Sequence, residues 1–161
     1  MATEKLKFVI ELYATFWDKK PTAEIQLGGK TYFPCTEIEG TEDNPTKIEF
    51  EAECEEDKIH TLTIIRDNKT KGQSVVNENG DLIKDQLLHI KSIEIDEIQL
   101  GNLLYTGTYT PTYPEPWATQ QKEAGKELPL TWTNVDRMGH NGKWEISFNS
   151  PFYMWLLENL Y

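Results

Sequence analysis

Residues 60–100 read HTLTIIRDNKTKGQSVVNENGDLIKDQLLHIKSIEIDEIQL, and this stretch decides the fold. Apolar residues that favour β-structure gather at both of its ends, and a polar segment rich in Asn, Gly and Lys separates them. Short apolar runs bounded by turn-forming residues are typical of strands. We therefore predict two long β-elements that are central to a sandwich. The loop between them should contain a short strand at 74–76 and a tight turn at 79–81.

The second β-element, residues 81–100, changes phase twice along its length. Its apolar positions fall into three pairs of alternating parity, namely Leu88 with Ile90, Ile93 with Ile95, and Ile98 with Leu100. Because side chains alternate between the two faces of a strand, one straight strand cannot keep all six on one face. Bulges or bends near 91–92 and 96–97 would restore the register, and a strand break is the alternative.

Period-two alternation predicts further strands on both sides of this stretch. The longest runs from Leu6 to Trp17, and one of its faces carries Leu6, Phe8, Ile10, Leu12, Ala14 and Phe16. Two glycines, Gly28 and Gly29, indicate a hairpin, and Pro34 ends its second strand or marks that strand as an edge. Additional strands are expected at 47–54, 58–66, 101–113 and 143–149.

Two segments favour helices instead. Ser150-Pro151 is a helix start signal, and the residues that follow it form a helical stripe, Phe152, Trp155, Leu156 and Leu160. A terminal strand is the competing interpretation. Residues 118–128 are rich in helix formers and fit a short surface helix. We expect residues 1–161 to form a single all-β domain, an antiparallel, jelly-roll-like β-sandwich with a short C-terminal helix.

The formal net charge of −11 limits the choice of partners. It disfavours nucleic acid and anionic membrane surfaces, which attract clustered Lys and Arg. It suits a basic partner surface or divalent cations. The first residues are not expected to form a signal peptide, and no apolar run reaches membrane-spanning length. Cys35 and Cys54 are expected to be free thiols, because a disulfide would require their strands to lie side by side.

Motifs that carry catalysis are missing from the sequence. It contains no H-E-x-x-H zinc pair, no G-x-S-x-G nucleophile turn and no phosphate-binding glycine loop. We therefore predict a protein that is not an enzyme, with no catalytic residues, no metal site and no cofactor. Calcium stays open, because Asp81, Asp85 and Asp96 lie in or near loops that offer oxygen ligands.

Aromatic residues are the best candidates for binding. Tyr109, Tyr113, Trp117 and Trp132 flank proline-rich or turn segments, where flat rings would suit sugar stacking or a protein interface. The alternative is that they cap the ends of the core. Phe152, Tyr153 and Trp155 make the last segment apolar almost all round. That segment must be buried or must form an assembly surface.

Two family resemblances follow from longer motifs. YTPTYPEPWATQQKEAGKELP at 109–129 and GHNGKWEISFNSPFYMWLLENL at 139–160, with residues 60–100, resemble small virion-associated proteins of tailed bacteriophages, notably marine and cyanobacterial phages. The resemblance covers roughly 46–161. It implies localisation in the virion after synthesis in the host cytoplasm. The layout of 60–100 is also similar to calcium-dependent xylan-binding β-sandwich modules.

These resemblances imply two functions. The first is a structural component of a phage virion, either capsid decoration or cement or a tail- or fibre-associated module. Its partners would be other virion proteins and further copies of itself in an oligomer, and neither nucleic acid nor a membrane. The alternative is a carbohydrate-binding module, calcium-dependent in the second family, that recognises a cell-surface glycan.

Overall fold

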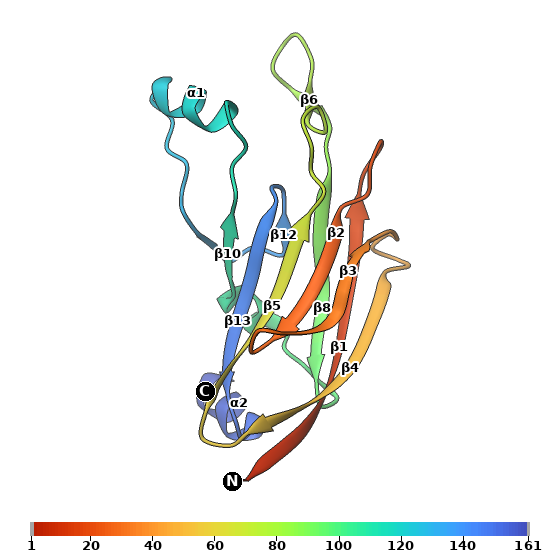
Figure 1. The fold of residues 1–161 in the computed structure, drawn as a ribbon, viewed down its shortest axis with the longest axis vertical. Coiled ribbons are helices and arrows are strands. Elements are labelled where there is room, and N and C mark those ends of the chain that lie inside the picture. Colours follow the sequence, from red (N-terminus) through yellow and green to blue (C-terminus); the bar gives the residue numbers. More distant parts are fainter. Residues whose placement is uncertain (1, 161) are drawn as a thin grey trace.

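Two antiparallel sheets pack face to face in the computed structural model, which describes residues 2–160 (Figure 1). The first sheet has the order β12, β8, β1, β4, with β9 paired to β8. These strands span Arg137–Met138, Leu87–Ile95, Thr3–Thr15, Thr46–Glu55 and Ile98–Gln99. The second has the order β11, β10, β13, β5, β2, β3, which span Trp132–Thr133, Thr108–Pro111, Gly142–Asn149, Ile59–Asp67, Thr22–Leu27 and Lys30–Glu37. A small hairpin pairs β6 with β7, Val75–Val76 and Leu82–Lys84.

Successive strands pass repeatedly from one sheet to the other. β1 lies in the first sheet, β2 and β3 in the second, β4 in the first and β5 in the second. This arrangement confirms the predicted antiparallel, jelly-roll-like sandwich. β5 lies between β13 and β2, and β8 between β12 and β1, so both predicted β-elements are central. The predicted short strand between them is also present as β6.

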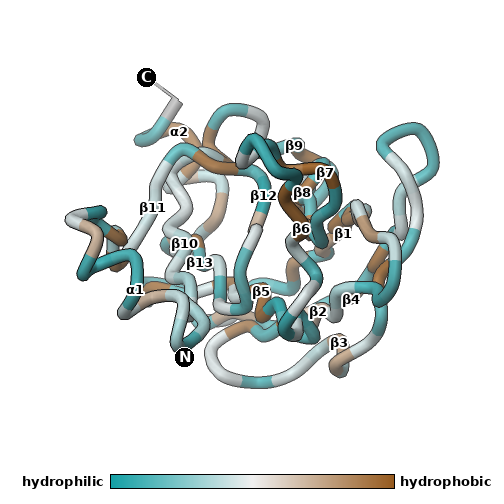
Figure 2. The backbone as a smooth tube through the Cα atoms, turned by 90° about the horizontal axis from the view of Figure 1, so that it is seen from above, coloured by the Kyte–Doolittle hydropathy of each residue, from teal (hydrophilic) through white to brown (hydrophobic). Residues whose placement is uncertain are grey.

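The core forms where the inward faces of the two sheets meet. Leu6, Phe8, Ile10 and Leu12 of β1 are buried as alternation predicts, but Phe16 lies beyond the end of β1 and is exposed, because the strand stops at Thr15. The second sheet opposes the buried β1 residues with buried side chains from three strands, Ile25, Leu62, Ile64, Trp144, Ile146 and Phe148. Fully burying one large apolar side chain stabilises a fold by about 1.5–3 kcal/mol. The view from above in Figure 2 shows the strands around this core, with hydrophobic stretches in brown on β8 and β5.

Both predicted irregularities of the second β-element are present. In the pairing of β1 with β8, Glu11 opposes Ser92 but Leu12 opposes Ile90, so Lys91 is the extra residue of a bulge. Asp96 and Glu97, with φ of 53° and 71°, form a two-residue turn between β8 and β9. The bulge allows Leu88, Ile90, Ile93 and Ile95 all to be buried, and the turn brings Ile98 back against Ile95.

The structure corrects the prediction for residues 101–113. Gly101–Thr106 forms a 3₁₀ helix, η1, and only the short strand β10 follows it. Leu100, Leu103 and Leu104 have the i, i+3, i+4 spacing of a helical face, and all three are buried. Burial of that face, rather than strand propensity, accounts for the helical turn.

The helix predictions are confirmed with small changes. α2 spans Phe152–Leu160 and buries Phe152, Trp155 and Leu156. The alternative of a terminal strand is therefore wrong. The side chain of Leu160, the fourth residue of the predicted stripe, lies outside the described residues. α1 spans only Trp117–Glu123, and Gly125 follows with a φ of +81°. None of the described helices is long and apolar enough to cross a membrane.

The remaining local predictions concern the hairpin and the cysteines. Gly28 and Gly29 both have positive φ at the turn between β2 and β3, and β3, which contains Pro34, is an edge strand of the second sheet. Cys35 is exposed on β3 and Cys54 is buried on β4, which belongs to the other sheet. Both are free thiols.

Candidate functional site: an aromatic cluster and a hydroxyl-lined hollow

The seven aromatic residues proposed as binding residues separate into two groups. Tyr109, Phe152 and Trp155 are buried and belong to the core. Burial leaves Tyr109 and Phe152 unable to offer a flat face to a ligand, whereas Trp155 keeps an edge in a pocket beside α2. The other four reach the surface: Tyr113, Trp117 and Trp132 gather in one place, and Tyr153 lies apart on α2, where its hydroxyl donates to Asp96 Oδ2 at 2.7 Å.

The first three form an aromatic cluster together with His140. Tyr113 lies in the extended segment after β10, Trp117 begins α1, Trp132 begins β11, and His140 lies in the turn between β12 and β13. The centroid of the His140 ring is 5.1 Å from that of Tyr113 and 5.4 Å from that of Trp117. The rings of Tyr113 and Trp117 are 6.1 Å apart. Segments about 30 residues apart in sequence therefore build one surface.

Hydrogen bonds hold the cluster in a fixed arrangement. The indole N–H of Trp132 donates to the Tyr113 hydroxyl at 3.0 Å, and that hydroxyl donates to the carbonyl of Pro129 at 2.6 Å. The buried Tyr109 hydroxyl accepts from the backbone N–H of His140 at 2.9 Å and donates to the His140 carbonyl. Tyr109 thus positions the cluster from below, a role that sequence reasoning did not assign to it.

The cluster is polar without being charged near neutral pH. Burial lowers the pKa of His140 to about 4, and the positive charges of Lys69 and Arg66 act in the same direction. Burial likewise raises the pKa of Tyr109 to about 12. The imidazole is therefore neutral at pH 7. Sequence reasoning placed His140 in a turn and gave it no function, because its aromatic neighbours come from other segments.

A shallow hollow lies on the second sheet near the other end of β10. It has a volume of about 520 Å³ and is lined by Thr61, Thr106, Thr108, Glu145, Ile146 and Ser147. Two of the hydroxyls, those of Thr61 and Ser147, contact each other at 2.8 Å. Thr108 on β10 lines the hollow and Tyr113 follows the end of β10, so this strand connects the hollow to the cluster. In the sequence, only the Thr and Ser residues on the outward faces of these strands indicate such a hollow.

Two of the three carboxylates that the sequence offers as calcium ligands already have partners. Asp85 accepts from Ser74 at 2.6 Å and pairs with Lys69 Nζ at 3.1 Å, and Asp96 accepts from Tyr153. Within residues 2–160, no three His, Cys, Asp or Glu side chains are placed to hold one metal ion. The predicted lack of a metal site and of a cofactor stays a prediction.

Comparisons with known proteins give a fold likeness only. No family model matches the chain, and no curated protein matches it. A solved structure described as "vCBM60 in complex with galactobiose" is similar over 86% of this chain and 95% of that chain, with 8% identity and a TM-score of 0.49. A second solved structure, described as "Circular permutation provides an evolutionary link between two families of calcium-dependent carbohydrate binding modules. SeMet form of vCBM60", is similar over 87% of this chain and 88% of that chain, with 8% identity and a TM-score of 0.45. The resemblance to tailed-phage proteins stays a prediction.

Proposed function

We propose that this protein is a non-catalytic carbohydrate-binding module that binds a neutral glycan at the aromatic cluster. The observation that carries the proposal is the exposure of two ordered indole rings. The side chains of Trp117 and Trp132 are 37% and 45% exposed, and the Trp132 indole is held by its hydrogen bond to Tyr113. Indole rings combine a large apolar face with one polar edge, which suits the apolar face of a sugar ring. Because hydrogen bonds already order Trp132, little freedom is lost when a ligand stacks on it.

The polar groups nearby suit a neutral ligand. The neutral His140 imidazole lies at the cluster, and the Tyr113 hydroxyl, which donates to Pro129, can accept a further hydrogen bond. The hollow adds hydroxyls and the carboxylate of Glu145. Sites for small ligands combine apolar walls with a few polar groups that fix orientation. The net charge of −11 opposes the approach of anionic glycans. A neutral oligosaccharide is therefore the expected ligand class.

The test is a glycan array followed by calorimetric titration of the best neutral oligosaccharide. We expect Trp117→Ala to weaken binding at least tenfold, which corresponds to about 1.4 kcal/mol. Trp17→Ala is the matched control. Trp17 is 45% exposed, against 37% for Trp117, but it lies just after β1, donates to the Gln73 carbonyl at 2.9 Å and takes no part in the cluster. EDTA should leave the affinity unchanged, because Asp85 and Asp96 already have partners.

A silent array, or equal effects of the two substitutions, would count against the proposal. Thermal unfolding of both variants separates lost contacts from lost folding. If EDTA abolished binding and calcium restored it, the protein would still bind a glycan. It would then also bind calcium, through ligands other than Asp85 and Asp96 as they are arranged here.

A second candidate is a structural subunit of a tailed-phage virion. The observation that favours it is the outer face of α2, where Tyr153, Met154 and Leu157 are each about half exposed or more. An exposed apolar helix face of this kind suits an assembly contact. Mass spectrometry of purified virions tests it. Many copies per particle would support a capsid or tail role, and absence from particles would eliminate it.

A further inference from the structure

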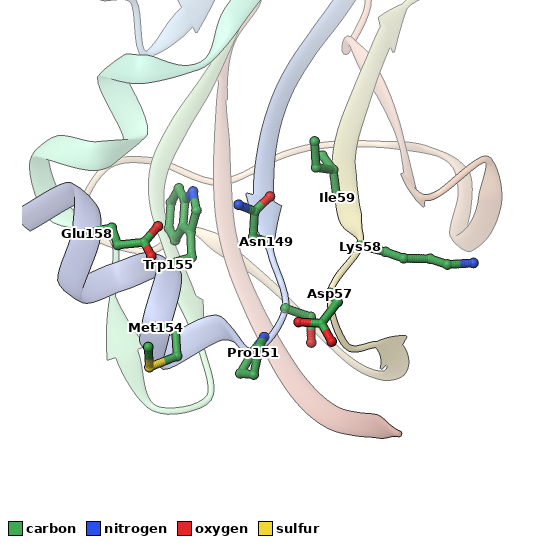
Figure 3. A pocket seen from close by; sticks show the side chains of 9 residues that line it. Asp57, Lys58, Ile59, Asn149, Pro151, Met154, Trp155 and Glu158 are labelled. Atoms are coloured by element: carbon green, nitrogen blue, oxygen red, sulfur yellow. The ribbon is translucent and has the colours of Figure 1, made fainter. Parts of the chain in front are cut away.

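A pocket of about 410 Å³ lies at the end of the molecule opposite α1, between the first residues of α2 and the turn from β4 to β5 (Figures 1 and 3). Its apolar walls come from Ile59, Met154 and Trp155, and Asn149 at the end of β13 adds an amide. Ile59 is 72% exposed and Met154 is 57% exposed, so the rim of the pocket is apolar as well. The volume falls within the range of ligand pockets.

The charges that line the pocket are negative on balance. Asp57 contributes a carboxylate from the β4–β5 turn and Glu158 contributes one from α2. Figure 3 shows them on different sides of the pocket. Within residues 2–160, neither carboxylate makes an ion pair or a side-chain hydrogen bond. Lys58 also borders the pocket, but its side chain points away, and its Nζ pairs with Glu55 at 2.5 Å.

The pocket is preformed. The Trp155 ring packs against Phe148 and Phe152, with ring centroids 6.2 Å and 5.9 Å away. The backbone N–H of Asp57 donates to the Ser150 carbonyl at 2.7 Å, which ties the β4–β5 turn to the start of α2. Glu4 accepts from the Phe152 N–H at 2.7 Å and from the Ser150 hydroxyl, and so holds that start in place. Binding needs little reordering of these residues.

We propose that this pocket binds a lysine or arginine side chain that a partner protein presents between apolar residues. These side chains have a long apolar stem and a charged end, and the pocket offers an apolar wall and two carboxylates. The exposed rim of Ile59 and Met154 favours a side chain carried on a protein over a free cation, because the neighbouring residues of the partner cover that rim. The net charge of −11 attracts a basic partner during encounter.

The test is an NMR titration with three blocked tripeptides, leucine–X–leucine, in which X is lysine, norleucine or glutamate. Norleucine has a stem of similar length without the charge. We expect the lysine peptide to shift the resonances of the Trp155 indole and the Asn149 amide, and to bind at least fivefold tighter than the norleucine peptide. The glutamate peptide should cause no shift. An arginine peptide should behave as the lysine peptide does.

The decisive variant is D57N combined with E158Q, which should remove the preference for lysine over norleucine. Asn tolerates the positive φ of 63° at position 57, so the turn is kept. The matched control is D43N combined with E53Q, which removes the same two charges from exposed positions outside the pocket and should keep the preference. If the double variant does not fold, D57N and E158Q are measured separately, and each should lose part of the preference for lysine over norleucine.

Three outcomes would overturn the proposal. The first is equal binding of the lysine and norleucine peptides. The second is binding of free cadaverine as tight as that of the lysine peptide, which would make the ligand a small cation. The third is self-association in sedimentation velocity that closes the pocket, which would make the occupant a second copy of this chain. None of these results bears on glycan binding at the aromatic cluster.

Discussion

Arg66 shows how one buried residue can organise the end of the sandwich near the cluster. Its side chain is 1% exposed, its Nη1 donates to Asn141 Oδ1 at 2.8 Å, and its Nη2 donates to the Gln86 carbonyl at 2.6 Å. Asn141 directly follows His140, and Gln86 ends the long loop before β8. A charged side chain is retained at this depth only where acceptors surround it. Arg66 therefore fixes the turn that carries His140.

We predict that Arg66→Met lowers the free energy of unfolding by about 2 kcal/mol, because the Gln86 carbonyl is left buried and unpaired. Urea unfolding measures the change. Arg137→Met is the matched control, since Arg137 is the other arginine of the chain and is exposed. It should change stability by less than about 0.5 kcal/mol. Equal effects of the two substitutions would show that the buried hydrogen bonds contribute nothing measurable.

At the scale of elements, the turn between β8 and β9 has residues poorly matched to its geometry. Asp96 and Glu97 both have positive φ, as in the two-residue hairpin turns that favour Asn and Gly. Asp96 also accepts the Tyr153 hydroxyl, which links the turn to α2. Glu97 is exposed, and no hydrogen bond of its side chain compensates for its strained backbone within the described residues.

Glu97→Gly should raise the free energy of unfolding by about 0.5–1 kcal/mol, because glycine adopts this conformation without strain. The control is Glu53→Gly on β4, where φ is not positive and the residue is also exposed. That substitution should lower stability by about 0.5–1 kcal/mol. The two glycines thus move the urea midpoint in opposite directions, and a loss of stability in both variants would refute the strain argument.

Sequence patterns predicted the elements whose faces are set locally. Alternation predicted the buried face of β1 and of β13, and the double change of phase predicted both the bulge at Lys91 and the turn at Asp96. The 3₁₀ helix η1 was missed because its leucines were read for β propensity and not for helical spacing. The aromatic cluster was predicted only in part, because His140 meets Tyr113 and Trp117 through folding of segments that no local pattern connects.

At the scale of the whole molecule, the two proposed sites lie at opposite ends of the long axis. Figure 1 shows α1, which begins with Trp117, at one end and α2, which borders the pocket of Asp57 and Glu158, at the other. The core of the sandwich separates them. Their chemistry also differs, since one offers neutral rings, hydroxyls and a single carboxylate, and the other offers two carboxylates beside apolar walls. A molecule of this shape can hold a glycan at one end and a basic partner at the other.

This separation predicts that salt affects only one of the two ligands. Raising NaCl from about 20 mM to about 200 mM shortens the screening length to below about 10 Å. Binding of the lysine tripeptide should weaken several-fold, because it depends on attraction to Asp57 and Glu158. Binding of a neutral oligosaccharide should stay the same, because stacking on Trp117 and Trp132 involves no net charge. Calorimetric titrations of each ligand, alone and with the other at saturation, measure both effects. A salt-sensitive glycan affinity, or an affinity for one ligand that changes with the other, would show that the two ends do not act independently.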